Sequence, residues 1–215
     1  KEADIYAKNI DLSTGFGVFD VYEKGNKFLF TAQLSVPGMH NVANALAAIC
    51  AVRCCSNVSE EAIKSGLLSF TGVKRRFEKV GVHPTGAQII DDYAHHPEEI
   101  SAALSSIRNS YPDMKMTVVF QPHLYTRTRD FADEFAVALS KADKLILLDI
   151  YPARELPIPG VTSEIIFRNV TCAEKVLIQR SELMEYLAGE KIELLVTVGA
   201  GDIDRFVGPI AQMLK

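Results

Sequence analysis

The amino-acid sequence contains no hydrophobic run that approaches the roughly 20 residues needed to span a bilayer, and no charged-then-apolar leader opens it. It also lacks an excess of positive charge, since 23 Lys and Arg residues against 27 Asp and Glu residues give a net charge of −4. We therefore expect no membrane partner, no nucleic-acid partner and a cytoplasmic location. With 215 residues, 48% of them hydrophobic, the chain can fill the core of one large or two modest domains. Nothing in the sequence indicates an oligomeric state.

Cysteine is scarce, and one widespread nucleotide-binding motif is absent. Cys50, Cys54 and Cys55 fall on a predicted helix and Cys172 stands alone, so neither a paired CxxC motif nor a small disulfide scaffold is present. We expect all four to be small core residues. No GxxxxGK[ST] phosphate loop occurs anywhere in the chain, so the backbone cradle and the lysine that usually hold an ATP triphosphate are missing.

The predicted secondary structure changes in character near Gly72. Before it, residues 15–34 predict a hairpin of two strands around a Gly25-Asn26 turn, residues 41–53 have helical spacing of apolar side chains, and another helix starts at Ser59 and ends near Gly66. After it, strands and helices alternate. The expected strands lie near residues 87–91, 116–120, 144–149, 173–178 and 193–198, and the expected helices near residues 98–109, 130–141, 181–187 and 205–214.

Several of these strands are near-continuous apolar runs, which is what a sheet covered on both faces requires. Examples are residues 118–119, 145–148 and 194–198. We therefore predict an α/β fold, Rossmann-like, with a mostly parallel sheet and helices on both faces. Residues 152–160 (PARELPIPG) are the segment in which we expect a mobile loop.

Polar clusters follow two of the predicted strands. The run DDYAHHPEEI, residues 91–100, comes after the strand that ends near residue 90, and QPHLYTRTRD, residues 121–130, comes after residues 116–120. Open α/β sheets bind ligands in the crevice at the carboxyl ends of their strands. The two clusters are therefore predicted to line one shared cleft, and we call them the first rim and the second rim.

The rims contain residue types that also bind metals. Imidazole and carboxylate groups are ordinary zinc or iron ligands, and the candidates are Asp91, Asp92, His95, His96 and His123. Adjacent residues, however, rarely point to one centre, and the sequence has no HxxxH or HExxH spacing. We therefore predict no dedicated metal site.

Each cluster also has a purely structural interpretation, which the residues alone leave open. An Asn at the start of the helix over residues 41–53 could cap it. The basic triplet at residues 74–76 could be a solvated boundary turn or a phosphate contact. The remaining structural interpretations are a helix-proximal cap and a surface acid for Asp91 and Asp92, a helix start for His96 before Pro97, and loop or cap positions for Thr126 and Thr128.

Five segments, taken in order, resemble the Mur ligases. They are VPGMHNVANALAA (residues 36–48), GVKRRFE (72–78), DDYAHHPEEI (91–100), FQPHLYTRTRDF (120–131) and GAGDI (199–203). The resemblance implies a three-domain enzyme, of which residues 1–73 would be the end of the central ATP-binding domain and residues 74–215 the C-terminal domain, with a hinge at Gly72-Val73. Because the phosphate loop is missing and the chain starts at Lys1 without a methionine, we expect an excised fragment that is inactive alone.

The resemblance is strongest to the members that use ATP and Mg²⁺ to join L-alanine to UDP-N-acetylmuramate in peptidoglycan precursor synthesis. In that reaction the sugar's lactyl carboxylate becomes an acyl phosphate, which the amine of alanine attacks. A related ligase that attaches a ready-made peptide to the same sugar stays open as an alternative. A stand-alone α/β binding module or a metal hydrolase is the third possibility.

The resemblance also implies roles for individual residues on the nucleotide side. Asn44 would contact adenine with support from His40 and Asn41, since an amide offers both a donor and an acceptor. Arg75, with Arg76 as the alternative, would reach the transferring γ-phosphate. Asp92 would contact the ribose.

The residues implied for the amino-acid substrate come from both rims. They are Tyr93, His95, His123, Tyr125 and Arg127. Arg75, His95 and His123 would be catalytic, and either histidine could accept the amine proton because imidazole titrates near neutrality. Many family members have an arginine where this chain has Leu124. Arg127 is therefore expected to be the principal anchor for the carboxylate of alanine.

Overall fold

The computed structural model describes residues 3–82 and 86–213, with the side chain of residue 82 left out, and the chain divides into two compact units. The N-terminal unit is Lys1–Val73 and the C-terminal unit is Lys74–Lys215. Among the described residues, no helix is both long enough and apolar enough to cross a membrane.

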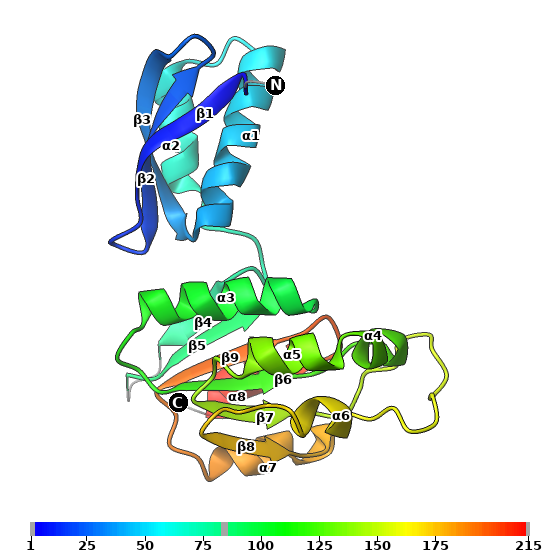
Figure 1. Ribbon diagram of the computed structural model, residues 1–215. Helices are drawn as coiled ribbons and strands as arrows, with labels where there is room; N and C mark the ends of the chain where they lie inside the picture. The colour runs from blue at the N-terminus through cyan, green and yellow to red at the C-terminus, as the bar shows by residue number, and fades with distance from the viewer. Residues whose placement is uncertain (1–2, 83–85, 214–215) are drawn as a thin grey trace. The chain divides into compact units, whose positions relative to one another are not determined.

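The N-terminal unit is a three-stranded antiparallel sheet packed against helices (Figure 1). Its elements are β1 (Ile5–Asp11), β2 (Phe16–Glu23), β3 (Lys27–Pro37), α1 (Met39–Cys55) and α2 (Glu60–Ser69). The predicted hairpin is confirmed, since β2 pairs with β3 through a turn in which Gly25 and Asn26 both have positive φ. Its core brings Phe19 and Phe30 of the sheet against Val42 and Ile49 of α1. The sequence did not reveal β1, whose last four residues, Lys8 to Asp11, are exposed and mostly polar.

The C-terminal unit contains a six-stranded sheet with the order β4-β5-β9-β6-β7-β8. The strands are β4 (Glu78–Val82), β5 (Gln88–Asp92), β6 (Met116–Phe120), β7 (Lys144–Leu147), β8 (Glu174–Leu177) and β9 (Leu194–Val198). All neighbours are parallel except β4, which pairs antiparallel with β5. The mostly parallel sheet is therefore confirmed, and β4 is an antiparallel edge strand that the sequence did not reveal.

Helices cover both faces of this sheet, as predicted. The helices are α3 (Pro97–Ser110), α4 (Tyr125–Asp130), α5 (Ala132–Leu139), α6 (Glu164–Phe167), α7 (Leu183–Ala188) and α8 (Asp204–Met213), with a 3-10 turn, η1, at Arg180–Glu182. Along β6, Val118 faces the layer of α3, α5 and α6, whereas Val119 faces the layer of α7 and α8. Successive strand residues point to opposite faces, which is why these strands had to be apolar throughout.

Two expectations about local structure are wrong. Residues 125–130 form the short helix α4 rather than a loop, and Thr128 is fully buried there, donating its hydroxyl to the carbonyl of Leu124 at 2.8 Å. None of the cysteines is a core residue, since Cys54 and Cys55 are exposed and Cys50 and Cys172 are only partly buried. The reason on α1 is that only the face with Val42, Ala45 and Ile49 meets the sheet.

Candidate functional site

The strand order brings the two rims together with a third segment between them. Because β9 lies between β5 and β6 and all three are parallel, their carboxyl ends meet at one edge of the sheet. The first rim follows β5, the second rim follows β6, and residues 199–203 follow β9. The shared edge that the sequence predicted therefore has GAGDI at its centre.

The two aspartates of the first rim, Asp91 and Asp92, are buried, so the interpretation of one of them as a surface acid is wrong. Asp91 accepts a hydrogen bond from the hydroxyl of Thr197 at 2.7 Å and one from Nε of Arg75 at 2.9 Å. Asp92 accepts backbone N–H bonds from Phe77 and Ala94, both at 2.8 Å. Burial raises the pKa of Asp92 in spite of these bonds, which by themselves lower it. Both side chains thus tie β5 to the segments around it.

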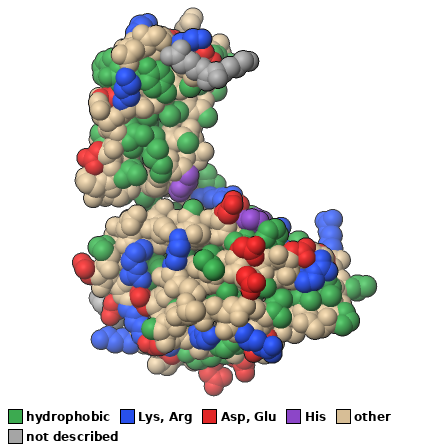
Figure 2. All heavy atoms as spheres, viewed as in Figure 1, with side chains coloured by type: hydrophobic (Ala, Val, Ile, Leu, Met, Phe, Trp, Pro, Cys, Tyr) green, Lys and Arg blue, Asp and Glu red, His purple; other side chains and the backbone are tan. Residues whose placement is uncertain are grey.

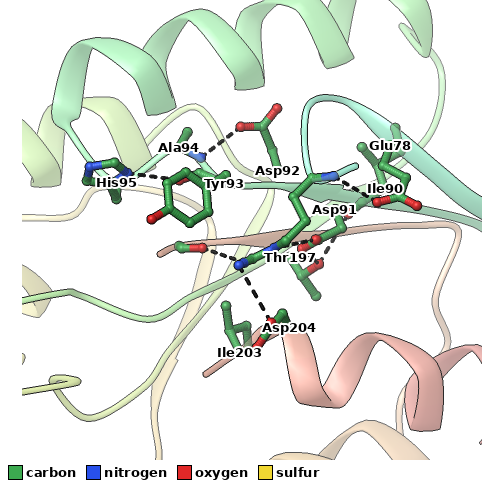
Figure 3. Close-up of polar contacts among 12 residues, drawn as sticks. Glu78, Ile90, Asp91, Asp92, Tyr93, Ala94, His95, Thr197, Ile203 and Asp204 are labelled. Atoms are coloured by element: carbon green, nitrogen blue, oxygen red, sulfur yellow. Dashed lines mark hydrogen bonds and ion pairs between the residues drawn. The ribbon is translucent and has the colours of Figure 1, made fainter. Parts of the chain in front are cut away.

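Arg75 is held inside the protein by several partners. Its guanidinium donates to the carbonyl of Gly199 at 2.6 Å as well as to Asp91, and it lies 3.8 Å from a carboxylate oxygen of Asp204. Figure 3 shows Asp91, Thr197 and Asp204 converging here from β5, β9 and the first residue of α8. The backbone of Arg75 has a positive φ of 60° and its N–H donates to Glu78. Arg75 therefore links the first rim to the segment after β9.

Arg76, the next residue, has a different environment. Its side chain is exposed, and among the described residues its guanidinium has no hydrogen bond or ion pair. It stands 5.8 Å from the ring centroid of Tyr93, whose ring Arg75 also approaches at 5.1 Å. Of the two arginines, Arg76 is the one that remains available to a ligand.

A row of ring–ring contacts, which we call the ladder, extends from the first rim to the second rim. The Tyr93 and His95 rings lie 5.1 Å apart, His95 and His123 lie 6.2 Å apart, and His123 stacks on Tyr151 at 5.7 Å. Nδ1 of His95 lies 3.0 Å from the carbonyl oxygen of Tyr93. Because a carbonyl can only accept, Nδ1 of a neutral His95 carries the proton and Nε2 is left as a proton acceptor.

His96, in contrast, does not join the ladder. It occupies the N-cap position of α3 before Pro97, as its structural interpretation predicts, and its ring packs against Phe131 at 4.9 Å. The carboxylate of Glu99 accepts the backbone N–H groups of His95 and His96. Among residues 3–82 and 86–213, no group of three or more His, Cys, Asp or Glu side chains is arranged to hold a metal ion.

In the part of the chain that the structure describes, two buried nitrogen atoms of the second rim have no hydrogen-bond partner. They are Nδ1 of His123 and a terminal nitrogen, Nη1, of Arg127. Buried polar atoms are nearly always hydrogen-bonded to protein or ordered water, so these two nitrogens can each bond a ligand atom or a water molecule. Burial is the largest cause that lowers the pKa of His123, followed by the charge of Arg127 and by His95 when that ring is protonated, while Glu155 opposes this. This shift favours the neutral form of the His123 imidazole. Tyr125 opens α4 beside these residues and is partly buried.

Two residues to which sequence reasoning assigned no role, Gln121 and Arg180, anchor the segment after β9. Gln121 is buried; its amide donates to Asp202 at 3.0 Å, and its carbonyl oxygen accepts the N–H of Ile203 at 3.0 Å. Arg180 forms an ion pair with Asp202. A Cβ on Gly199 would lie 2.8 Å from the backbone oxygen of Gln121. The glycines of GAGDI were a weak signal of this close packing, but nothing in the sequence pointed to Arg180.

The residues implied for adenine belong to the other unit, where they occupy the first turns of α1. His40 and Asn44 are exposed. The Asn41 amide donates to the carbonyl of Pro37 at 2.7 Å, and that of Asn44 lies 3.3 Å from the side-chain oxygen of Asn41. The N-cap of α1 is Gly38 without a side-chain bond, so the interpretation of an Asn as helix cap is wrong.

Comparison with known proteins gives consistent results. Residues 75–202 match the family described as Mur ligase, glutamate ligase domain. The chain is 45% identical over 212 residues to UDP-N-acetylmuramate--L-alanine ligase of Parabacteroides distasonis, covering 99% of this chain and 45% of that protein. It is 43% identical over 214 residues to the enzyme of the same name from Cytophaga hutchinsonii, covering 100% of this chain and 45% of that protein. The chain thus spans about half the length of these curated relatives.

Solved structures show the same fold. The crystal structure of UDP-N-acetylmuramate-alanine ligase from Thermotoga maritima matches with a TM-score of 0.81 and 27% identity, over 99% of this chain and 46% of that one. A murein peptide ligase from Psychrobacter arcticus matches with a TM-score of 0.69 and 21% identity, over 99% of this chain and 44% of that one. The second likeness shows the fold alone.

Proposed function

Because the chain belongs to the Mur ligase family, we propose that it forms the C-terminal half of an ATP-dependent ligase that joins L-alanine to UDP-N-acetylmuramate. Relatives that align with 99% or more of the chain at 43–45% identity, and that bear this name, support the choice within the family. Residues 1–73 would complete a central ATP-binding domain, and residues 74–215 would be the C-terminal domain. The product would enter peptidoglycan synthesis, and the enzyme would be located in the cytoplasm.

The observation that carries the proposal is the pair of unpartnered nitrogens on the second rim. A carboxylate is acceptor-only, and an arginine binds it through charge-assisted bonds that can be bidentate. The carboxylate of alanine would therefore complete the bonding of Arg127, with the His123 imidazole beside it. Tyr93, His95 and Tyr125 would line the remainder of the amino-acid site. Leu124 offers no second cation here, so Arg127 would be the main anchor.

On the nucleotide side, the contacts favour Arg76 over Arg75 as the cation for the γ-phosphate. Arg75 would have to break bonds to Asp91 and Gly199, whereas Arg76 has none to break. Arg75 then acts as a positioning residue. Both oxygens of Asp92 already accept backbone bonds, which favours a role in shaping the rim over the ribose contact that the resemblance implies. The exposed amide of Asn44, supported by His40 and Asn41, would face adenine.

The reaction places distinct demands on these residues. The γ-phosphoryl group of ATP would pass to the lactyl carboxylate and ADP would leave. Mg²⁺, held with the triphosphate by parts of the enzyme outside this chain, would neutralise the charge of the transferring group. Arg76 would add one positive charge to that transfer. The amine of alanine then attacks the acyl carbon, phosphate leaves, and the amine proton goes to an imidazole. His95 through Nε2 and the neutral His123 are both suitable acceptors.

The decisive experiment is a substrate comparison in the full-length ligase. We expect ADP release that depends on both UDP-N-acetylmuramate and L-alanine, and little release when a tripeptide replaces alanine. Preference for the tripeptide would instead identify the peptide-attaching ligase. ADP release without any amino-acid dependence, or zinc-dependent hydrolysis, would contradict the proposal. The 215-residue chain alone should give no turnover, because it lacks the phosphate loop.

A further inference from the structure

The short helix α4, which carries Tyr125 and Arg127, begins without a cap of its own. The residue at its N-cap position is Leu124, whose side chain has no hydrogen-bond acceptor and whose φ is 74°. Helices usually begin at Ser, Thr, Asp or Asn because those side chains accept the first free N–H groups. In this chain the acceptor comes from Glu155, which lies 29 residues further along.

Glu155 accepts hydrogen bonds from the backbone N–H and the side-chain hydroxyl of Thr126. One of its carboxylate oxygens accepts the backbone N–H of Thr126 at 2.9 Å, and the other accepts the threonine hydroxyl. These bonds hold the pKa of Glu155 below its usual value, so that it stays charged at neutral pH. An ionised carboxylate forms stronger hydrogen bonds than a neutral acceptor. The first turn of α4 is thus fastened to a segment distant in sequence.

The segment that supplies Glu155, residues 151–155, is hydrogen-bonded to the backbone of the second rim. The backbone N–H of Tyr151 donates to Pro122 at 2.8 Å, and that of Leu124 donates to Tyr151 at 3.0 Å. Then a turn closed by the N–H of Glu155 and the carbonyl of Pro152, at 2.9 Å, directs Glu155 back to Thr126. The next residue, Leu156, is 85% exposed. The hydrogen bonds of Glu155 therefore join this segment to the second rim immediately before the exposed Leu156.

We propose that Glu155 is a positioning residue that sets the affinity for the amino-acid carboxylate by holding the start of α4, and with it Arg127. This inference rests on the proposed function. Arg127 directly follows the residue that Glu155 binds, and a guanidinium can grip a carboxylate in two places only when its plane is aligned. Segment 151–155 thus serves amino-acid binding without touching the substrate.

The test is steady-state kinetics of the full-length ligase with Glu155→Ala and Glu155→Gln. We expect Glu155→Ala to raise KM for alanine about tenfold, less than the ~100-fold that an ångström of misplacement can cost. The glutamine variant, which keeps one acceptor oxygen, should lie between Glu155→Ala and the parent. KM for ATP and for UDP-N-acetylmuramate should stay within about twofold. The matched control is Glu164→Ala. Glu164 lies in the same connection between β7 and β8, and among the described residues its carboxylate pairs only with the exposed Arg168.

A second variant protects the test against a folding defect. Thr126→Val removes the hydroxyl at nearly constant volume, and it should raise KM for alanine by itself, with Glu155→Ala adding less in that background than in the parent. An unchanged KM for alanine in Glu155→Ala, or an equal rise for all three substrates, would overturn the inference. If the parent enzyme itself showed no alanine-dependent turnover, the proposed function would be the part that fails.

Discussion

At the scale of single residues, Arg75 and Arg76 differ most in what surrounds their charged groups. Removing Arg75 leaves the buried carboxylate of Asp91 without its cation, and breaking a buried pair in this way typically costs about 3 to 5 kcal/mol. Since Arg75 is partly exposed, we expect Arg75→Ala to lower the free energy of unfolding of the chain by about 2 to 4 kcal/mol.

Arg76→Ala should change stability by no more than about 0.5 kcal/mol, as usual for exposed sites, and yet abolish most turnover in the full-length ligase. Urea denaturation of this chain and turnover of the full-length enzyme measure the two effects. The reverse pattern would return the phosphate role to Arg75.

Arg127 offers a second residue-scale prediction. A hydrogen bond to a charged group is typically worth about 1.5 to 3 kcal/mol, so Arg127→Ala should reduce kcat/KM for alanine by roughly 10- to 150-fold while KM for ATP stays nearly constant. Arg127→Lys should restore only part of the loss, because it returns the charge without the planar fork. If Arg127→Ala kept kcat/KM for alanine within about twofold of the parent, the second rim would not be the amino-acid site.

His123 connects the site to pH-dependent stability. Burial and nearby positive charges lower its pKa below the usual 6.5, so the unfolded chain takes up the proton more readily than the folded one. Stability contributed by this group is therefore complete above pH 6.5 and is lost as the pH falls from there to the lower folded pKa. His123→Gln has no proton to bind, so between pH 7.5 and 5 it should lose less stability than the parent in urea denaturation. An identical pH dependence in both proteins would show that His123 is not perturbed.

At the scale of elements, the segment between β9 and α8 depends on close packing. A Cβ on Gly201 would lie 2.5 Å from the side-chain oxygen of Gln121 and 2.9 Å from Cβ of Tyr151. Overpacking of this kind costs about 1 to 3 kcal/mol, and we expect Gly201→Ala to lower the free energy of unfolding by that amount. Because Gln121 and Tyr151 support the second rim, alanine binding should weaken as well.

Gly66 in α2 is the matched control for Gly201. Nothing lies within 4 Å of a Cβ built there, and alanine is about 0.5 to 1 kcal/mol better than glycine inside a helix. Gly66→Ala should therefore stabilise the chain or leave it unchanged, as thermal denaturation would show. Equal destabilisation by both substitutions would mean that packing at Gly201 is not the cause.

At the scale of the whole molecule, the C-terminal unit has what an autonomous domain needs. It holds a sheet with a helical layer and a hydrophobic cluster on each face. Figure 2 shows its acidic and basic side chains interspersed over the visible face, whereas hydrophobic side chains gather on the visible face of the N-terminal unit. We expect residues 74–215 alone to unfold cooperatively, with a Tm within a few degrees of its transition in the intact chain.

The N-terminal unit, residues 1–73, should be the less stable of the two when isolated. Helix α1 exposes apolar and small residues outside its buried face, with Met39 52% and Val52 36% exposed. Calorimetry of the two separate pieces would measure the difference. A non-cooperative melt for residues 74–215 would contradict this division of the molecule.

Much of the element order was already readable in the sequence, because hydrophobic periodicity is a local property. The apolar run at residues 116–120 coincides with β6, and the hairpin turn at Gly25 needed only the two residues that favour positive φ. Both rims were also readable, since polar residues directly follow apolar strands. The strands β1 and β4 and the helix α4 were not predicted, because their apolar residues show too little periodicity to distinguish these segments from loops.

Tertiary structure decided everything that depends on partners distant in sequence. The insertion of β9 between β5 and β6 placed GAGDI between the rims, and long-range contacts made Arg75 an internal anchor while Arg76 stayed exposed. The contact between Glu155 and Thr126 likewise joins residues that are distant in sequence. Side-chain type and spacing determine which chemistry a segment can offer, but burial and pairing arise only when the folded sheet brings separate segments to one edge.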